Sequence, residues 1–258
     1  MATNKRSPIT DNPLRAPGQS LTEEITRIID DEVLPYLLMV AMAVALAALE
    51  WWRWYTEAPY APVAYSMVAV IMTVISGYKI IGYKKRLAKL RLGRKGEVVV
   101  GQYLELLREQ GYRVFHDLIG EGFNLDHVVV SEQGIFTIET KTYSKPASGQ
   151  PTVIYTGDEI IVDGFNTGDK IVNQAAAQAN WLRTTLKEMT GEQYAVKPVV
   201  VFPGWYVKTR TNSNQLWVLN PKALPVFIEN QPKVLSQEKM MMIAYQLSRF
   251  IRVSNQQK

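Results

Sequence analysis

The chain has 258 residues, a net charge of +5 at neutral pH and no cysteine. This length accommodates a packed domain together with an appendage, and the lack of cysteine excludes disulfides, thiol nucleophiles and cysteine zinc sites. With His116 and His127 as its two histidines, the chain has little from which to build a histidine-rich metal site or a serine triad.

Two uncharged hydrophobic runs follow an N-terminal tail. The tail, residues 1–32, is predicted to be largely disordered, because its first 20 residues are rich in Pro, Ser, Asn and Thr. The runs, at 33–49 and 58–78, have tryptophan and tyrosine at their ends, and each is near the length that a hydrocarbon core of about 30 Å requires. We therefore expect a transmembrane hairpin over residues 33–82. The alternative, a pair of buried helices in a soluble domain, is less favoured because neither run shows an amphipathic stripe.

A basic segment follows the second run. Residues 79–95 carry eight lysines and arginines and no acidic residue, so the positive-inside bias places this segment and the domain behind it in the cytosol. Two spans return the N-terminus to the same side, which predicts a multi-pass protein of the cell membrane. The basic juxtamembrane segment, 83–95, can set topology and contact anionic lipid headgroups, or it can be a nucleic-acid footprint. Its position directly after a span favours the first.

The remaining chain mixes helix and strand patterns. This mixture indicates an α/β or α+β fold with a mixed sheet flanked by helices over residues 96–202, and a C-terminal extension with a terminal helix over 203–258. The expected helices are 96–110, 170–189 and one that follows the capping residue Ser236, and the expected strands are 112–117, 125–131, 135–142, 151–162 as a hairpin, and 196–202. Residues 205–235 show no regular pattern.

One predicted β-hairpin concentrates two carboxylates and a lysine. Strand alternation places Glu139 and Lys141 on the same face of its second strand. If the turn 131–134 is symmetric, Asp126 lies opposite Glu139, and two facing carboxylates repel each other unless a cation lies between them. A register shifted by two residues would instead pair Asp126 with Lys141 as a surface ion pair.

Five blocks of this region occur in an order that resembles the nuclease-related domain, which is similar to the PD-(D/E)XK nuclease superfamily. They are Gly93-Arg-Lys-Gly96-Glu97, Tyr112-Arg-Val-Phe-His-Asp-Leu118, Asn124-Leu-Asp126-His127, Gly134-Ile-Phe-Thr-Ile-Glu139-Thr-Lys141, and Asn173-Gln174 with Gln178. The resemblance covers roughly residues 93–200. It implies a restriction-endonuclease-like mixed sheet, with metal ligands from the first helix, an Asp and the acid of the E-x-K tripeptide.

Carried onto this chain, the resemblance implies a Mg²⁺ or Mn²⁺ site. Its ligands would be Asp126, Glu139, the backbone carbonyl of Thr140 and Glu97, because these hard cations prefer oxygen. Lys141 would orient the attacking water or stabilise developing negative charge. Without the resemblance, Glu97 is equally well explained by a favourable interaction with the helix dipole.

The resemblance also implies a role for the helix at 170–189. Its Gln178 would support the active site or touch the nucleic-acid backbone, and Gln174 lies on the same face. A glutamine in such a place more commonly lies at the edge of a helix–sheet contact, without a role in a site. His127 alternates with Asp126 and is expected to face the core as a structural residue.

These inferences predict a membrane-anchored, metal-dependent nuclease that hydrolyses DNA or RNA on the cytosolic side. The alternative is a catalytically silent, membrane-tethered nucleic-acid-binding or scaffold domain, since potential ligands do not establish turnover. A transporter or channel is disfavoured because neither hydrophobic run contains a charge.

Overall fold

The structure is a computed structural model that describes residues 13–59, 61–120, 122–146 and 148–254. The chain forms two compact units. The helical unit comprises residues 20–92, and the sheet unit comprises residues 93–254 together with the described residues 13–19 that precede the helical unit.

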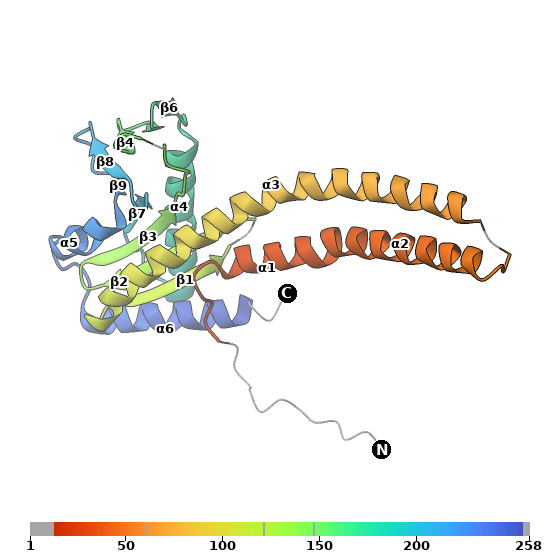
Figure 1. The fold of residues 1–258 in the computed structure, drawn as a ribbon. Helices are drawn as coiled ribbons and strands as arrows, with labels where there is room; N and C mark the ends of the chain where they lie inside the picture. The colour runs from red at the N-terminus through yellow and green to blue at the C-terminus, as the bar shows by residue number, and fades with distance from the viewer. Residues whose placement is uncertain (1–12, 60, 121, 147, 255–258) are drawn as a thin grey trace, which may run out of the picture. The chain divides into compact units, whose positions relative to one another are not determined.

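The helical unit is built from long helices, of which α2 and the first part of α3 run side by side (Figure 1). Its elements are α1 (Gln19–Arg27), the π-helical segment η1 (Ile28–Val33), α2 (Leu34–Tyr55) and α3, which begins here and runs from Pro62 to Glu109. Both hydrophobic runs are therefore helical, as expected. The predicted basic segment and the first helix of the domain belong to one continuous helix, α3, because no proline interrupts them.

The expectation of a largely disordered tail over residues 1–32 is wrong for its second half. Helix α1 and segment η1 are ordered because Ile25 and Ile28 are buried against Leu87 of α3. These isoleucines have helical spacing. The prediction of disorder relied on composition, which is dominated by the polar residues around them. Residues 1–12 lie outside the described residues.

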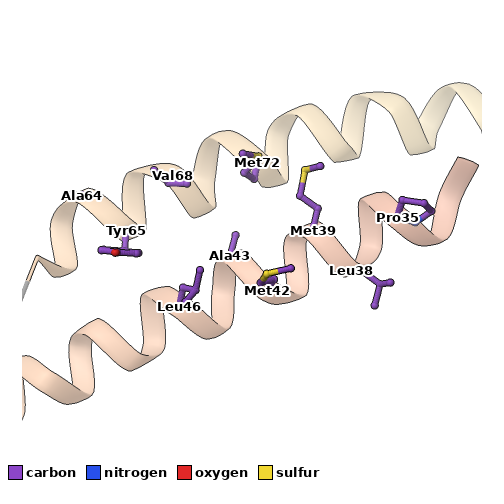
Figure 2. A pocket seen from close by; sticks show the side chains of 10 residues that line it. All are labelled: Pro35, Leu38, Met39, Met42, Ala43, Leu46, Ala64, Tyr65, Val68 and Met72. Carbon is purple, nitrogen blue, oxygen red and sulfur yellow. The ribbon is translucent and has the colours of Figure 1, made fainter.

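Most apolar side chains of α2 and of the first part of α3 are exposed. In the most apolar stretch of each helix, 6% and 11% of the residues are buried. An apolar groove of about 580 Å³ lies between α2 and α3. Figure 2 shows Met39 and Ala43 of α2 and Tyr65 of α3 pointing into it. A soluble protein rarely leaves so large a contiguous apolar surface open to water.

The sheet unit centres on a five-stranded mixed sheet in the order β1-β2-β3-β7-β9. Strands β1, β2 and β3 are antiparallel neighbours, whereas β7 and β9 continue the sheet in parallel with β3. Their bounds are β1 Arg113–Ile119, β2 Asn124–Ser131, β3 Gly134–Thr140, β7 Val196–Val201 and β9 Trp217–Leu219. These strands read as runs of β-branched and aromatic residues because helices cover both faces of the sheet.

Two hydrophobic cores fix those helices. On one face, α4 (Lys170–Thr190) and α6 (Gln237–Ser254) pack on the antiparallel strands through Leu182 and Leu247. On the other face, the last turns of α3 and the short α5 (Leu224–Glu229), which follows the 3-10 turn η2 (Pro221–Ala223), pack on β3, β7 and β9. Helix α4 ends at Gly191, which adopts the left-handed conformation at φ 75°.

A smaller four-stranded sheet, in the order β6-β5-β4-β8, lies beyond the end of β3. Its strands are β4 Thr152–Tyr155, β5 Ile160–Val162, β6 Phe165–Asn166 and β8 Tyr206–Thr209. Its inner face buries Val153 and Tyr155 against Phe202. The predicted hairpin at 151–162 is confirmed.

The region beyond residue 202 is more regular than expected and is not an appendage. It supplies β9 to the main sheet, β8 to the small sheet, and α5 and α6 to the two cores. The strands were missed because each is only three or four residues long, which is too short for a recognisable alternation. The predicted cap of α6 is confirmed, since the backbone N–H of Lys239 donates to Oγ of Ser236.

Candidate active site

The β2–β3 hairpin has the register in which the two carboxylates face each other. His127 pairs with Ile138 and Ser131 with Gly134, so the next pair along the hairpin is Asp126 with Glu139. The alternative register, with Asp126 opposite Lys141, is wrong. Gly134 adopts φ 137° at the turn, a conformation that favours glycine, and this tight turn fixes the register.

Glu139 is 4% exposed and both of its carboxylate oxygens are engaged. Its Oε2 accepts a 2.6 Å hydrogen bond from the Gln178 amide, and its Oε1 accepts 2.8 Å and 2.6 Å hydrogen bonds from Gln174 and Lys141. Lys141 also donates to Oε1 of Gln174 at 2.8 Å. Gln178 is buried, and it donates a second hydrogen bond to the backbone oxygen of Asn124. Helix α4 therefore holds the Glu139 carboxylate in one orientation.

Asp126 is half-buried beside this carboxylate. Its Oδ2 accepts a 2.7 Å hydrogen bond from the backbone N–H of Thr140. Desolvation raises the pKa of Asp126 well above its usual range, and the charges of Glu139 and Glu97 act in the same direction. Two carboxylates that face each other in this way bind either one shared proton or a cation.

Glu97 enters the same cluster from α3. The preceding Gly96 permits this approach, because a Cβ there would lie 1.9 Å from Oγ1 of Thr142. Burial raises the pKa of Glu97 to about 8, aided by the charges of Asp117 and Glu139 and opposed by a hydrogen bond from the backbone of Gly18. The glycine of the Gly96-Glu97 pair is thus explained by close packing.

Two further charged residues belong to the cluster and were missed from the sequence. Asp117 adopts φ 52° where one pair is missing from the β1–β2 ladder, although the register is the same on both sides. Its carboxylate forms a 2.7 Å ion pair with Nε of Arg15. The two side chains are 3% and 4% exposed. Aspartate adopts this left-handed backbone conformation more readily than most residues do.

The segment that carries Arg15 packs tightly on α3. A Cβ at Gly101 would lie 2.5 Å from Cγ of Pro17, so this glycine makes room for the segment. Gly18 donates its backbone N–H to Glu97. Residues 13–19 are consequently an integral part of the sheet unit, although about 80 residues, including both long apolar helices, separate them from Glu97 along the chain.

His116 and His127 are the neighbours of Asp117 and Asp126 in β1 and β2. By strand alternation their side chains face the other side of the sheet. Nδ1 of His116 is 2.8 Å from Nδ1 of His127, and both rings are buried. One nitrogen must donate and the other accept, so at least the accepting ring is neutral, and burial lowers the pKa of each histidine. His127 faces the core, as expected from its alternation with Asp126.

The arrangement can hold a hard cation through few protein ligands. Among the described residues, no group of three or more His, Cys, Asp or Glu side chains converges as a ready metal site. Asp126 and Glu139 nevertheless face each other, and Mg²⁺ is commonly held by one or two carboxylates with waters completing its shell. The donor set therefore fits a Mg²⁺- or Mn²⁺-type ion, with main-chain oxygen and water as the other ligands.

The raised carboxyl pKa values predict that the metal-free protein loses stability as pH rises. Glu97 keeps its proton up to about pH 8 in the folded state but releases it near its ordinary value when unfolded, so the folded state binds more protons between these limits. Its stabilising contribution is complete at low pH and is lost as pH rises through 8. Urea unfolding in chelator between pH 5 and 8.5 is expected to show a decline of up to about 1.4 kcal/mol per pH unit for each such proton.

The control for this measurement is Glu97→Gln, which mimics the protonated side chain. This variant is expected to show a shallower decline than the parent, because the amide has no proton to release. An equal slope in both proteins would mean that Glu97 is not the group that titrates.

The sheet unit thus combines a mixed sheet flanked by helices with an E-x-K tripeptide at the end of β3, an Asp opposite its Glu, and one glutamate from α3. Residues 92–203 match the family described as the nuclease-related domain, and we conclude that the chain carries such a domain. An uncharacterized protein of Bacillus anthracis is 35% identical over 65 residues, which are 23% of this chain and 30% of that protein. The match thus spans less than a third of that relative. No solved structure matches the chain.

Proposed function

We propose that the protein is a membrane-anchored, metal-dependent nuclease that hydrolyses phosphodiester bonds of DNA or RNA. The observation that carries this proposal is the register of the β2–β3 hairpin, which sets Asp126 opposite Glu139 and places Lys141 within 2.6 Å of Glu139. The match to the nuclease-related domain supports the same function. Asp126, Glu139, the backbone carbonyl of Thr140 and Glu97 would hold Mg²⁺ or Mn²⁺.

The metal, when bound, would supply a water of lowered pKa and would neutralise phosphate charge. The chain's own residues set the geometry around it. Gln178 and Gln174 orient the Glu139 carboxylate, and the backbone N–H of Thr140 orients Asp126. Lys141 is partly exposed at the edge of the cluster, where its ammonium would orient the attacking water or stabilise the charge that develops on the phosphate.

The orienting role of Gln178 gives a direct prediction. Gln178→Ala removes the hydrogen bond to Oε2 of Glu139, and metal affinity is expected to fall about 10- to 100-fold, the usual effect of losing a group that orients a ligand. Titration calorimetry with Mn²⁺ measures this. Asn173→Ala on the same helix is the control, because Asn173 bonds to Asp169 and not to the cluster. Equal affinities in the two variants would contradict the role.

Membrane anchoring is part of the proposal. It rests on the two helices that are long and apolar enough to span a bilayer and on the exposure of their side chains. The excess of lysine and arginine over residues 79–95 supports a cytosolic position for the domain and for the N-terminus. Anionic lipid headgroups are the expected contact of this segment.

Fractionation of cells that express the full chain tests the anchor. The protein is expected in the membrane fraction, to remain there in alkaline carbonate and high salt, and to be released by detergent. Release by salt alone would contradict two spanning helices, because it would indicate a charge contact with the membrane surface.

A specific observation favours a second candidate, a silent tethered scaffold or nucleic-acid-binding domain. Both oxygens of Glu139 already accept hydrogen bonds from α4 and Lys141, so the carboxylate is satisfied without a metal. Calorimetry on the full chain in detergent separates the two candidates. Mn²⁺ uptake that is lost in Asp126→Asn supports the nuclease, whereas no uptake by the parent supports the scaffold.

A further inference from the structure

A band of basic and aromatic side chains leads away from Lys141 over the small sheet. Lys141 is followed at alternate positions by Tyr143 and Lys145, and β8 with the residue after it contributes three more such residues. We call this band the basic–aromatic stripe; its members are Tyr143, Lys145, Tyr206, Lys208 and Arg210.

Backbone hydrogen bonds and one close approach join the two halves of the stripe. The segment after β3 runs beside the one after β7, since the backbone N–H of Lys141 donates to Val201 and that of Tyr206 donates to Pro151. Between these points Lys145 lies against Gly204, where a Cβ would be 2.7 Å from its Nζ. The stripe is therefore continuous with the candidate active site through Lys141.

The rings and cations of the stripe are open to solvent. Tyr206 is 50% exposed, and it points away from the core because its neighbour Val207 packs inward. Tyr143 is 37% exposed, and its ring lies nearly parallel to that of the buried Phe202, with 18° between the ring planes. The ammonium of Lys208 lies 5.6 Å from the centre of the Tyr206 ring.

The charge of the stripe is not neutralised within the protein. In the part of the chain that the structure describes, Lys145, Lys208 and Arg210 form no ion pair with a carboxylate. The acidic turn at 158–159 lies next to Thr211, beyond Arg210, and limits the stripe at that end. Open cations that alternate with open aromatic rings match a single strand, whose phosphates and base faces are both accessible.

We propose that the basic–aromatic stripe binds single-stranded nucleic acid and delivers it to the site at Asp126 and Glu139. This inference deepens the proposed function and rests on it for the direction of the strand. Tyr206 and Tyr143 stack on bases, while Lys145, Lys208 and Arg210 contact phosphates. A duplex engages the cations alone, because its base faces are stacked inside, so the stripe favours single strands.

The test is binding to the full chain in detergent micelles, in chelator so that no cleavage occurs. The probes are a fluorescent oligothymidylate and a duplex of the same length, measured by anisotropy over a range of salt. Tyr206→Ala is expected to weaken single-strand binding about tenfold while leaving duplex binding unchanged, because stacking on one base is lost. Lys208→Gln is expected to lower the slope of log affinity against log salt by about 0.7 for single strands.

Matched variants guard against general damage. Tyr206→Phe keeps the ring and is expected to bind as the parent does. Phe165→Ala removes an aromatic side chain that is 78% exposed on the opposite edge of the same sheet, and Lys222→Gln removes an exposed lysine outside the stripe. Neither change is expected to alter affinity or salt slope.

Three results would overturn the inference: tighter binding of the duplex by the parent, an equal loss for both probes in Tyr206→Ala, or no difference between Tyr206→Ala and Phe165→Ala. The two proposals fail separately. Binding that depends on the stripe, without Mn²⁺-dependent cleavage, would contradict the proposed nuclease activity but support the proposed binding surface. If Tyr206→Ala changes neither cleavage nor binding, the proposed binding surface is contradicted but the proposed nuclease activity is not.

Discussion

Replacing Arg15 by alanine is expected to lower the free energy of unfolding of the sheet unit by about 3–5 kcal/mol. The guanidinium and the Asp117 carboxylate are both nearly fully buried, at 4% and 3% exposure, and are 2.7 Å apart. Removing Arg15 takes away a positive charge that stabilises the buried Asp117 carboxylate. Denaturant unfolding of the full chain in detergent, followed by tryptophan fluorescence, measures the change.

Lys239→Ala is the matched control in the same unit. Its ion pair with Glu192 has a similar length of 2.6 Å, but both side chains are about half exposed, and such pairs contribute about 0–1 kcal/mol. Arg15→Ala combined with Asp117→Asn is expected to recover part of the loss, because asparagine carries no charge and tolerates φ 52°. A loss no larger than that of Lys239→Ala would contradict the buried pair.

Asp126→Asn is expected to reduce metal-dependent cleavage by at least about a hundredfold, since it removes a negatively charged ligand that would hold the metal. The amide oxygen can still accept the hydrogen bond from Thr140, so the hairpin is expected to stay folded. Initial rates of cleavage in Mn²⁺ and Mn²⁺ affinity by calorimetry measure the effect. Asp158→Asn, in the turn of the small sheet, is the control and is expected to cut as the parent does.

Retained cleavage in Asp126→Asn would mean that the chemistry takes place elsewhere. Lost cleavage with unchanged Mn²⁺ affinity would assign Asp126 to a step other than metal binding. The proposal requires both quantities to fall together.

Local patterns predicted most of the main sheet. The turn and the alternation on either side of it limited the hairpin to two registers, of which the structure has the symmetric one. These features depend on neighbours that are close in sequence or on a helix with a clear apolar face. The family resemblance, and not a local pattern, pointed to Gln178 as the helix partner of Glu139. Gln174, which the spacing placed on the same helix face as Gln178, bonds to Glu139 as directly as Gln178 does.

Long-range contacts could not be predicted in the same way. The pairing of Arg15 with Asp117 joins residues 102 apart, and nothing in the composition of the N-terminal tail distinguishes this arginine from Arg6. Asp117 lies in a recognised block, but its role depends on a local interruption of strand pairing that has no simple sequence signature. The glycine at 101 was the available signal, since a glycine within a helix often marks a close approach.

The N-terminal contact affects how the protein must be studied. A fragment that begins near Lys84 would lack Arg15 and the backbone N–H of Gly18, so it would lose the 2.7 Å ion pair to Asp117 and the hydrogen bond to Glu97. Such a fragment is expected to be less stable and to bind metal more weakly than the full chain. Activity assays therefore call for the full chain in detergent.

Nucleic-acid cleavage by the full chain tests the central claim most directly. Plasmid DNA and RNA are incubated in Mn²⁺ or in chelator with the parent and with a Glu139→Ala, Lys141→Ala double variant that is purified identically and has the same circular dichroism. We expect cutting by the parent in Mn²⁺, no cutting in chelator, and none by the double variant. No cutting by the parent, or equal cutting by both proteins, would contradict the assignment of a metal-dependent nuclease site to Asp126, Glu139 and Lys141.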